Sequence, residues 1–245
     1  MDLRIAIIGT GNVGTWLLRT FQTQNFFTVA SFSSRKIETV SANFDLYVFA
    51  LKDDVYELVL QQIPFIMPYA VHTSGSLSQN ILARYSKQFG VLYPYQSISN
   101  AEKVEIIEEN YYVMSYDFAP ICVEGSNPEF EEILFNLSKA IFQNVYKVKE
   151  KQRFAMHLAA VFANNFTNAM YGIAYNIFKE NNLDWSLIYP LLENTLEKAK
   201  NKDPHLSQTG PAIRKDVSIM EKHCNTLNNT ELETLYRLVS KIIQK

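Results

Sequence analysis

The stretch LRIAIIGTGNVG, which runs from Leu3 to Gly14, is the most informative part of this sequence. Its apolar first half, residues 3–8, is rich in isoleucine and is typical of a buried parallel strand. Three of the chain's 8 glycines follow and form a G-x-G-x-x-G motif. Apolar residues at helical spacing then continue to about Asn25. This order of strand, glycine loop and helix predicts a dinucleotide-binding unit.

The glycine loop is expected to hold a pyrophosphate. Gly9 allows a tight turn, Gly11 lets the backbone approach the phosphates, and Gly14 lets the helix pack against the strand. The free N–H groups and partial positive charge at the start of the helix favour the same anion. The alternative is that the glycines serve only a turn. We expect cofactor contacts from the whole loop: Gly9, Thr10, Gly11, Asn12, Val13 and Gly14.

The end of the second predicted strand, residues 27–32, favours NADP over NAD as the cofactor. NAD-binding proteins usually carry an acidic residue there, which binds the ribose 2′-hydroxyl. This chain has Ser33, Ser34 and Arg35 instead, and a 2′-phosphate prefers hydroxyl donors and a guanidinium group. The alternative is an ordinary basic helix start, with Ser34 as its N-cap.

Two more strands, predicted at residues 45–51 and 70–76, are expected to end near the cofactor, because ligands of such sheets bind outside the carboxyl ends of the strands. Leu51, Lys52 and Ser74 are the expected contacts there, and His72 is a further candidate. The alternative is that the polar loop residues satisfy backbone groups. Further strands are expected at residues 90–97, 106–115, 119–125 and 144–148.

After Lys149 the strand signals end and the sequence becomes helical. We therefore predict a doubly wound, mostly parallel α/β domain at residues 1–149 and an all-helical domain at 150–245.

The first helix of the second domain is predicted over residues 152–180. At about 100° per residue it aligns His157 with Asn164 and Asn168, and Asn165 lies about 80° away. Polar groups in an apolar helix need hydrogen-bond partners or a ligand. His157 is therefore either a residue that contacts a ligand or a core histidine whose hydrogen bonds are satisfied within the protein.

A second candidate segment lies at residues 209–216. Thr209 resembles an N-cap with Pro211 in the first turn of a helix that continues to about His223. The helix dipole and the guanidinium of Arg214 are expected to bind a small carboxylate, and simple capping with a solvated Arg214 is the alternative. We expect substrate contacts from Thr209, Gly210 and Asp216. Thr230 is the expected N-cap of a last helix.

Composition and charge exclude several classes of protein. The net charge of −2 gives no electrostatic reason to expect nucleic acid or an anionic membrane surface as a partner. No stretch approaches ~20 apolar residues, so no membrane span is expected. The 2 cysteines predict buried thiols in a reducing compartment, which favours the cytoplasm. No spacing of histidine and cysteine fits a metal site.

The arrangement resembles two-domain NADP oxidoreductases such as pyrroline-5-carboxylate reductase, ketopantoate reductase and deazaflavin-dependent NADP oxidoreductase. It is most similar to a bacterial branch that joins a Rossmann-like domain to a helical domain of unknown function, number 2520. The resemblance covers essentially the whole chain. Two positions depart from the pattern: Tyr93, where many members have histidine, and Lys215, where many have glycine. The more specific motifs are HTSGS at 72–76, YPYQS at 93–97, HLAA at 157–160 with Asn165, and TGP at 209–211 with Arg214 and Asp216.

This resemblance implies a Rossmann-like fold and an NADP cofactor, but no particular substrate. We expect transfer of hydride to or from a small carbonyl, imine or hydroxy compound, which is anionic if Arg214 binds it. His157 is the expected general acid or base because its ordinary pKa is near neutrality, and Asn165 would orient the substrate. A non-catalytic NADP-binding sensor or scaffold is the main alternative. A methyltransferase or flavoprotein with a similar glycine loop is a further one.

A homodimer that forms through the helical domain is also expected. The helical half is too apolar for a thin layer beside a sheet, and the related reductases suggest a two-fold pairing of helical domains. The alternative is a monomer in which the long helix covers the sheet.

Overall fold

The structure, a computed structural model, describes residues 3–99, 118–227 and 229–245. The chain divides into two compact units, the sheet unit Met1–Ala169 and the helical unit Met170–Lys245. The functional boundary expected between residues 149 and 150 stays a prediction.

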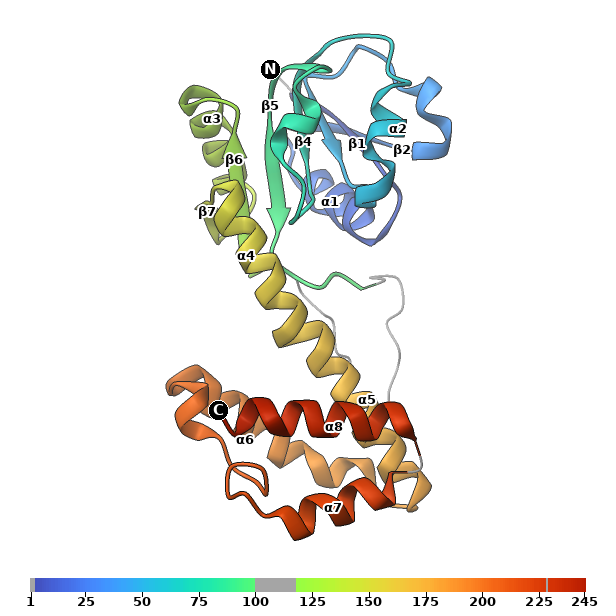
Figure 1. Cartoon of the computed structure of the whole chain (residues 1–245). Helices are drawn as coiled ribbons and strands as arrows, with labels where there is room; N and C mark the ends of the chain where they lie inside the picture. The colour runs from blue at the N-terminus through green and yellow to red at the C-terminus, as the bar shows by residue number, and fades with distance from the viewer. Residues whose placement is uncertain (1–2, 100–117, 228) are drawn as a thin grey trace. The chain divides into compact units, whose positions relative to one another are not determined.

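The sheet unit has the Rossmann-like, doubly wound architecture that the sequence predicts (Figure 1). Its strand order is β2-β1-β3-β4-β5-β6-β7, and all neighbours are parallel except the antiparallel pair β5 and β6. The predicted strand at residues 106–115 lies outside the described residues. The strands are β1 Leu3–Ile8, β2 Phe27–Phe32, β3 Leu46–Phe49, β4 Met67–His72, β5 Ser86–Pro94, β6 Ile121–Gly125 and β7 Val145–Lys147.

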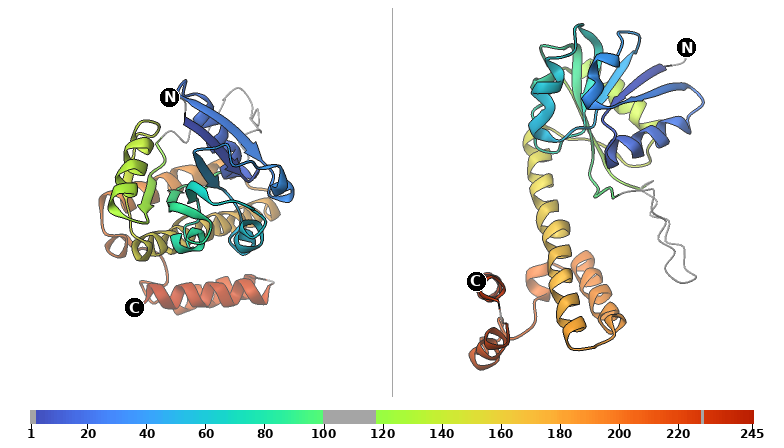
Figure 2. Two further views of the ribbon diagram at one scale, coloured as in Figure 1. Left: turned by 90° about the horizontal axis from the view of Figure 1, so that it is seen from above. Right: turned by 90° about the vertical axis from the view of Figure 1, so that its right-hand side faces the viewer.

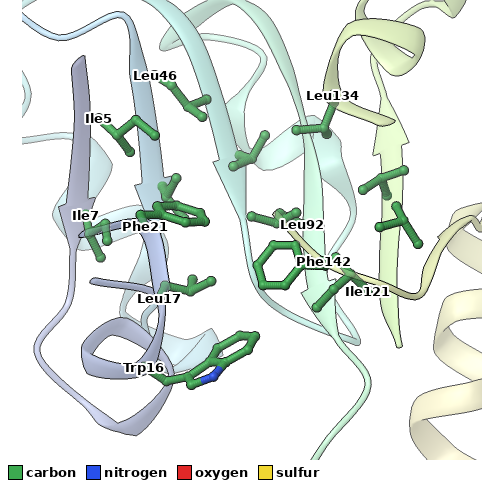
Figure 3. Close-up of a cluster of buried hydrophobic side chains, with 14 of the residues drawn as sticks. Ile5, Ile7, Trp16, Leu17, Phe21, Leu46, Leu92, Ile121, Leu134 and Phe142 are labelled. Carbon is green, nitrogen blue, oxygen red and sulfur yellow. The ribbon is translucent and has the colours of Figure 1, made fainter. Parts of the chain in front are cut away.

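Alternating side chains of the strands build two cores, one on each face of the sheet. In β1, Ile5 and Ile7 point into one core, and the neighbouring Ala6 and Ile8 point into the other. Helices α1 (Asn12–Gln22) and α3 (Pro128–Lys139) cover the first face, where Trp16 joins the cluster (Figure 3). Helix α2 (Tyr56–Leu60) covers the opposite face from α1 (Figure 2). Helices on both faces explain why β3 is buried along its whole length.

Short 3₁₀ helices complete the connections of the sheet unit. They follow β2, β3 and β4. Their bounds are η1 Ser34–Thr39, η2 Asp53–Val55 and η3 Gln79–Leu82.

The helix predicted over residues 152–180 is present, but it is not regular. Helix α4 (Glu150–Ala160) continues into a π-helical segment, η4 (Val161–Phe166), and then into α5 (Thr167–Glu180). The hydroxyl of Thr167 donates to the carbonyl of Phe162, five residues earlier, at 3.2 Å. Because a π-helix has more residues per turn than an α-helix, the predicted alignment of His157 with Asn168 at about 100° per residue is wrong.

The helical unit contains the remaining helices, and two predicted N-caps in it are wrong. Asn229, not Thr230, caps α8, because its side chain accepts from the N–H groups of Glu231 and Leu232 at 2.8 and 3.1 Å. Asp216, not Thr209, caps α7 through the N–H of Ile219. The bounds are η5 Trp185–Ile188, α6 Tyr189–Asn201, η6 Pro204–Ser207, α7 Val217–Thr226 and α8 Thr230–Ile243.

Candidate functional site

A cavity of about 780 Å³ lies at the carboxyl ends of β1, β2 and β3 in the sheet unit. It is bounded on its remaining side by residues of α2 and the segment before it. The structure thus brings together residues that the sequence assigns to the cofactor from three separate strand ends. These predicted residues are Gly9, Thr10, Gly11, Ser33, Ser34, Arg35, Leu51 and Lys52.

The cavity lies where the strand order reverses. The chain places β2 on one side of β1 and β3 on the other, so the connections after β1 and β3 diverge. Ligands of doubly wound sheets bind in the crevice that this divergence creates. The position of the cavity therefore fits a nucleotide that runs across the sheet edge.

The glycine loop has no room for a side chain at Gly9, where it packs against the end of β3, but is open at Gly11. Gly9 has φ +122°, and a Cβ atom there would lie 2.1 Å from the carbonyl oxygen of Ala50. A Cβ atom at Gly11 would meet nothing within 4 Å, so the backbone at this position is accessible. The N–H groups at the start of α1 can accordingly be approached by a phosphate, which is the group that a dinucleotide would place there.

The β2 end of the cavity holds two hydroxyls and a guanidinium. The Ser33 hydroxyl accepts from the N–H of Arg35 at 3.3 Å, so Ser33 caps η1 and the predicted cap at Ser34 is wrong. A hydroxyl that accepts one hydrogen bond keeps its own proton for donation. Ser33, Ser34 and the exposed Arg35 therefore offer the donors that a 2′-phosphate requires.

Four residues predicted to contact the cofactor do not line the cavity. The Asn12 amide donates to the carbonyl of Ile98 at 3.1 Å, and Val13 packs against the core of the sheet. Gly14 is buried against the Gly9 carbonyl. The Ser74 hydroxyl accepts from the N–H groups of Ser76 and Leu77 at 3.1 and 3.0 Å, so it shapes its own loop.

A second group of polar side chains lies at the ends of β4 and β5. The hydroxyl of Tyr93, near the end of β5, lies 3.1 Å from Nδ1 of His157 on α4. Gly75, in the loop after β4, packs against both rings, since a Cβ atom there would lie 2.7 Å from Nδ1 and 2.8 Å from Cζ of Tyr93. Strands β1, β3, β4 and β5 are parallel, so His157 stands at the same sheet edge as the cavity.

Arg153, a buried arginine on α4 that the sequence analysis missed, forms hydrogen bonds with the loop after β4. Arg153 is fully buried, and its Nη1 donates to the carbonyls of Ser74 and Leu77 at 3.1 and 2.8 Å. Its Nη2 lies 3.4 Å from the carboxylate of Glu124 on β6, which also accepts from the N–H of Glu150 at 3.2 Å. A carboxylate in the middle of a buried strand needs a hydrogen-bonding or charged partner. The position of Glu124 in an apolar predicted strand was therefore the sequence feature that could have indicated this ion pair.

His72 does not serve as a contact at the surface of the site. Its side chain is fully buried, and its Nδ1 accepts from the N–H of Ser74 at 3.2 Å. Burial, together with the positive charge of Arg153, lowers the pKa of His72 to about 3. The histidine is therefore neutral at physiological pH and belongs to the structure of the loop.

Asn165 lies in η4, belongs to the sheet unit as His157 does, and has an exposed side chain. The π-helical segment sets its angular position, so the offset of about 80° from His157 computed for an α-helix does not apply. π-helical segments occur frequently at functional sites, which makes this part of the helix a candidate surface.

The segment at residues 209–216 does not form the helix start that the sequence predicts. Gly210 has φ 105° and Lys215 has φ 56°, so the backbone leaves the helical path before α7 begins. Arg214 is exposed in the intervening turn, and Asp216 is used as the cap of α7. The predicted anion site on a helix dipole at Thr209 is therefore wrong, because no helix starts there.

Thr209 instead lines an apolar cavity of about 290 Å³ within the helical unit. Most of its lining comes from α5 and α8, including Ile173, Leu235 and Val239. Arg214 belongs to this unit and His157 to the other, so their convergence on one substrate stays a prediction.

The described part of the chain has neither a metal-binding cluster nor a membrane-spanning helix. No cluster of three or more histidine, cysteine, aspartate or glutamate side chains there could hold a metal ion. None of the described helices has the length and apolar character needed to cross a membrane. Both cysteines, Cys122 and Cys224, are free and buried, as the sequence analysis expects.

Comparison with known proteins identifies relatives of the chain. Residues 119–243 match the family model described as "Domain of unknown function (DUF2520)". The crystal structure of "putative NADP oxidoreductase BF3122" from Bacteroides fragilis is similar over 99% of this chain and 98% of that chain, with 28% identity and a TM-score of 0.83. No curated protein sequence matches the chain.

Two further solved structures share the fold at lower identity. Protein TM1727 from Thermotoga maritima has 20% identity and a TM-score of 0.65, with 98% of this chain and 96% of that chain covered. A 1-pyrroline-5-carboxylate reductase from Streptococcus pyogenes has 12% identity and a TM-score of 0.59, with 99% and 98% covered.

Proposed function

The chain belongs to the DUF2520 family, and we propose that it is an NADP(H)-dependent oxidoreductase. Its substrate is a small carbonyl, imine or hydroxy compound with a negative charge. The observation that carries the proposal is the cavity at the switch point of the sheet, which combines the glycine loop with Ser33, Ser34 and Arg35. Similarity to the structure described as a putative NADP oxidoreductase from Bacteroides fragilis, at 28% identity, supports the same activity.

The residues that hold the cofactor follow the order of the strands. Arg35 and the two serines after β2 bind the 2′-phosphate, and the N–H groups after β1 bind the pyrophosphate. Leu51 and Lys52 after β3 contact the ribose on the nicotinamide side. Bound NADPH supplies the hydride, and the chain supplies orientation and proton exchange.

His157 is the residue proposed to exchange a proton with the substrate. Neighbouring strands lie about 4.8 Å apart, so the end of β5 is roughly 14 Å along the sheet edge from the end of β1. A nucleotide anchored at the glycine loop extends in this direction, past β3 and toward Tyr93 and His157. Asn165 orients the substrate, and the exposed Arg214 binds its anionic group.

We also propose that residues 150–245 form a substrate and dimerisation domain and that residues 1–149 form an NADP-binding domain. Among the described residues of the helical unit, the buried apolar side chains are Ala212 and Cys224. Because few apolar side chains of the helical unit are buried, many are exposed to solvent in a single chain. A second copy of the chain would bury them.

The proposed activity is tested by following NADPH absorbance while the protein is mixed with a panel of small anionic carbonyl compounds and imines. Turnover that is lost in a heat-denatured control supports an oxidoreductase. Cofactor binding with no turnover on any member of the panel would favour the sensor or scaffold.

A further inference from the structure

The contact between Tyr93 and His157 determines which imidazole nitrogen can face a ligand. The two ring centroids lie 6.0 Å apart at an interplanar angle of 71°, and the Tyr93 hydroxyl lies 3.1 Å from Nδ1. Among the described residues, Nε2 of His157 has no hydrogen-bond partner, and the side chain is half-buried. Nδ1 is therefore used inside the protein, and Nε2 is the nitrogen left for a substrate.

The direction of this hydrogen bond follows from the proton of the phenol. Tyr93 is 9% exposed, and burial raises the pKa of its hydroxyl to about 12, so the phenol keeps its proton. Within the described residues, Nδ1 of His157 is the acceptor that this proton can reach. If Nδ1 carried a proton instead, the buried phenolic proton would have no acceptor, which is costly. Tyr93 accordingly donates and Nδ1 accepts.

We propose that Tyr93 is a positioning residue that holds His157 in the Nε2–H tautomer, so that the site presents a hydrogen-bond donor to the oxygen of a carbonyl substrate. This inference rests on the proposed oxidoreductase function and narrows the role of His157 from proton exchange to hydrogen-bond donation, so that the alkoxide formed by hydride transfer takes its proton from water. An Nε2–H group donates to an oxygen that gains negative charge as hydride arrives, which stabilises the transition state. A protonated imine nitrogen has no lone pair to accept this bond, so the site favours carbonyl and hydroxy compounds over imines and amines.

The surrounding chain keeps the pair in place. Gly75 lies close enough to both rings that any side chain at this position would displace them. Its loop is held in turn by the two hydrogen bonds from Arg153 to the carbonyls of Ser74 and Leu77. The orientation of the His157 ring is therefore set by β5, by the loop after β4 and by α4 together.

The test is the tautomer of His157 in the free, full-length protein, measured by long-range ¹H–¹⁵N correlation NMR. The chain has 4 histidines, so the signals can be assigned with a His157→Gln variant. We expect the Nε2–H tautomer in the wild type and a mixture of tautomers in Tyr93→Phe. Tyr95→Phe is the matched control, since it removes the hydroxyl of a neighbouring tyrosine whose ring centroid lies 6.2 Å from that of Tyr93. This control should keep the wild-type tautomer.

An Nδ1–H tautomer in the wild type, or an unchanged tautomer in Tyr93→Phe, would overturn the proposal. If Tyr93→Phe does not fold, Gly75→Ala provides the second variant, because its Cβ atom forces the two rings apart and should give the same mixture. The NMR result needs neither cofactor nor substrate, so it stands if the chain does not bind NADPH. Turnover with imines but with no carbonyl compound of the activity panel would overturn the substrate class.

Discussion

Replacing Arg153 with methionine should destabilise the sheet unit by about 3–5 kcal/mol. The guanidinium is fully buried, and its loss leaves the carboxylate of Glu124 without its ion-pair partner and two loop carbonyls without donors. Removing one partner of a buried ion pair costs about 3–5 kcal/mol, and two hydrogen bonds from a charged donor give a similar figure at roughly 1.5–3 kcal/mol each. This is a large part of the ~5–15 kcal/mol that stabilises a typical domain.

Urea denaturation followed by tryptophan fluorescence measures this effect in the sheet unit. Trp16 lies in the sheet core and Trp185 in the helical unit, so a Trp185→Phe background makes the signal specific for the sheet unit. With a slope of about 1–3 kcal/mol per molar urea, the midpoint should fall by roughly 1–5 M. Arg84→Met, at an exposed site, is the matched control and should change stability by less than about 0.5 kcal/mol.

A double variant separates the lost charge partner from lost packing. Adding Glu124→Gln to Arg153→Met removes the orphaned charge but keeps an acceptor for the N–H of Glu150. The double variant should therefore be more stable than Arg153→Met alone. A loss below about 1 kcal/mol for Arg153→Met, or no recovery in the double variant, would refute the reasoning.

Three further outcomes are expected. Arg35→Ala should weaken NADPH binding by about 10- to 150-fold, the range for a lost charge-assisted contact, and leave NADH binding almost unchanged in calorimetry; an equal loss for both would exclude a role at the 2′-phosphate. His157→Ala should keep the NADPH affinity and lower turnover by ~10²–10⁴-fold in the absorbance assay, and full turnover would remove His157 from the site. Light scattering at micromolar concentration should give twice the 28.2 kDa mass of one chain, whereas a single mass would reject the dimer.

The parts of the structure that follow from local pattern were predictable from the sequence. The strands β1 and β2 have the predicted bounds, because an apolar run between a polar start and a glycine or serine turn leaves little choice. The cavity lining at the ends of β1, β2 and β3 was predictable for a related reason. Once the sheet is parallel and doubly wound, its carboxyl ends must share one edge.

Features that depend on contacts distant in sequence were not predictable. Arg153 and Glu124 are 29 residues apart, and neither lies in a sequence motif from which the other could be predicted as its partner. Helix ends were missed where neighbouring polar residues compete for the same cap, as for Asn229 and Thr230. The π-helical segment was not predicted, because the spacing of apolar residues at 161–166 does not distinguish it from an α-helix.

The most direct test of the central claim is calorimetric titration of the wild-type chain with NADPH and, separately, with NADH. The cavity at the end of β2 offers two hydroxyls and the guanidinium of Arg35 to the 2′-phosphate. We predict that NADPH binds more tightly than NADH by about 10- to 150-fold, which corresponds to one charge-assisted contact. Tighter binding of NADH, or no binding of either nucleotide, would contradict the assignment of this cavity to NADP.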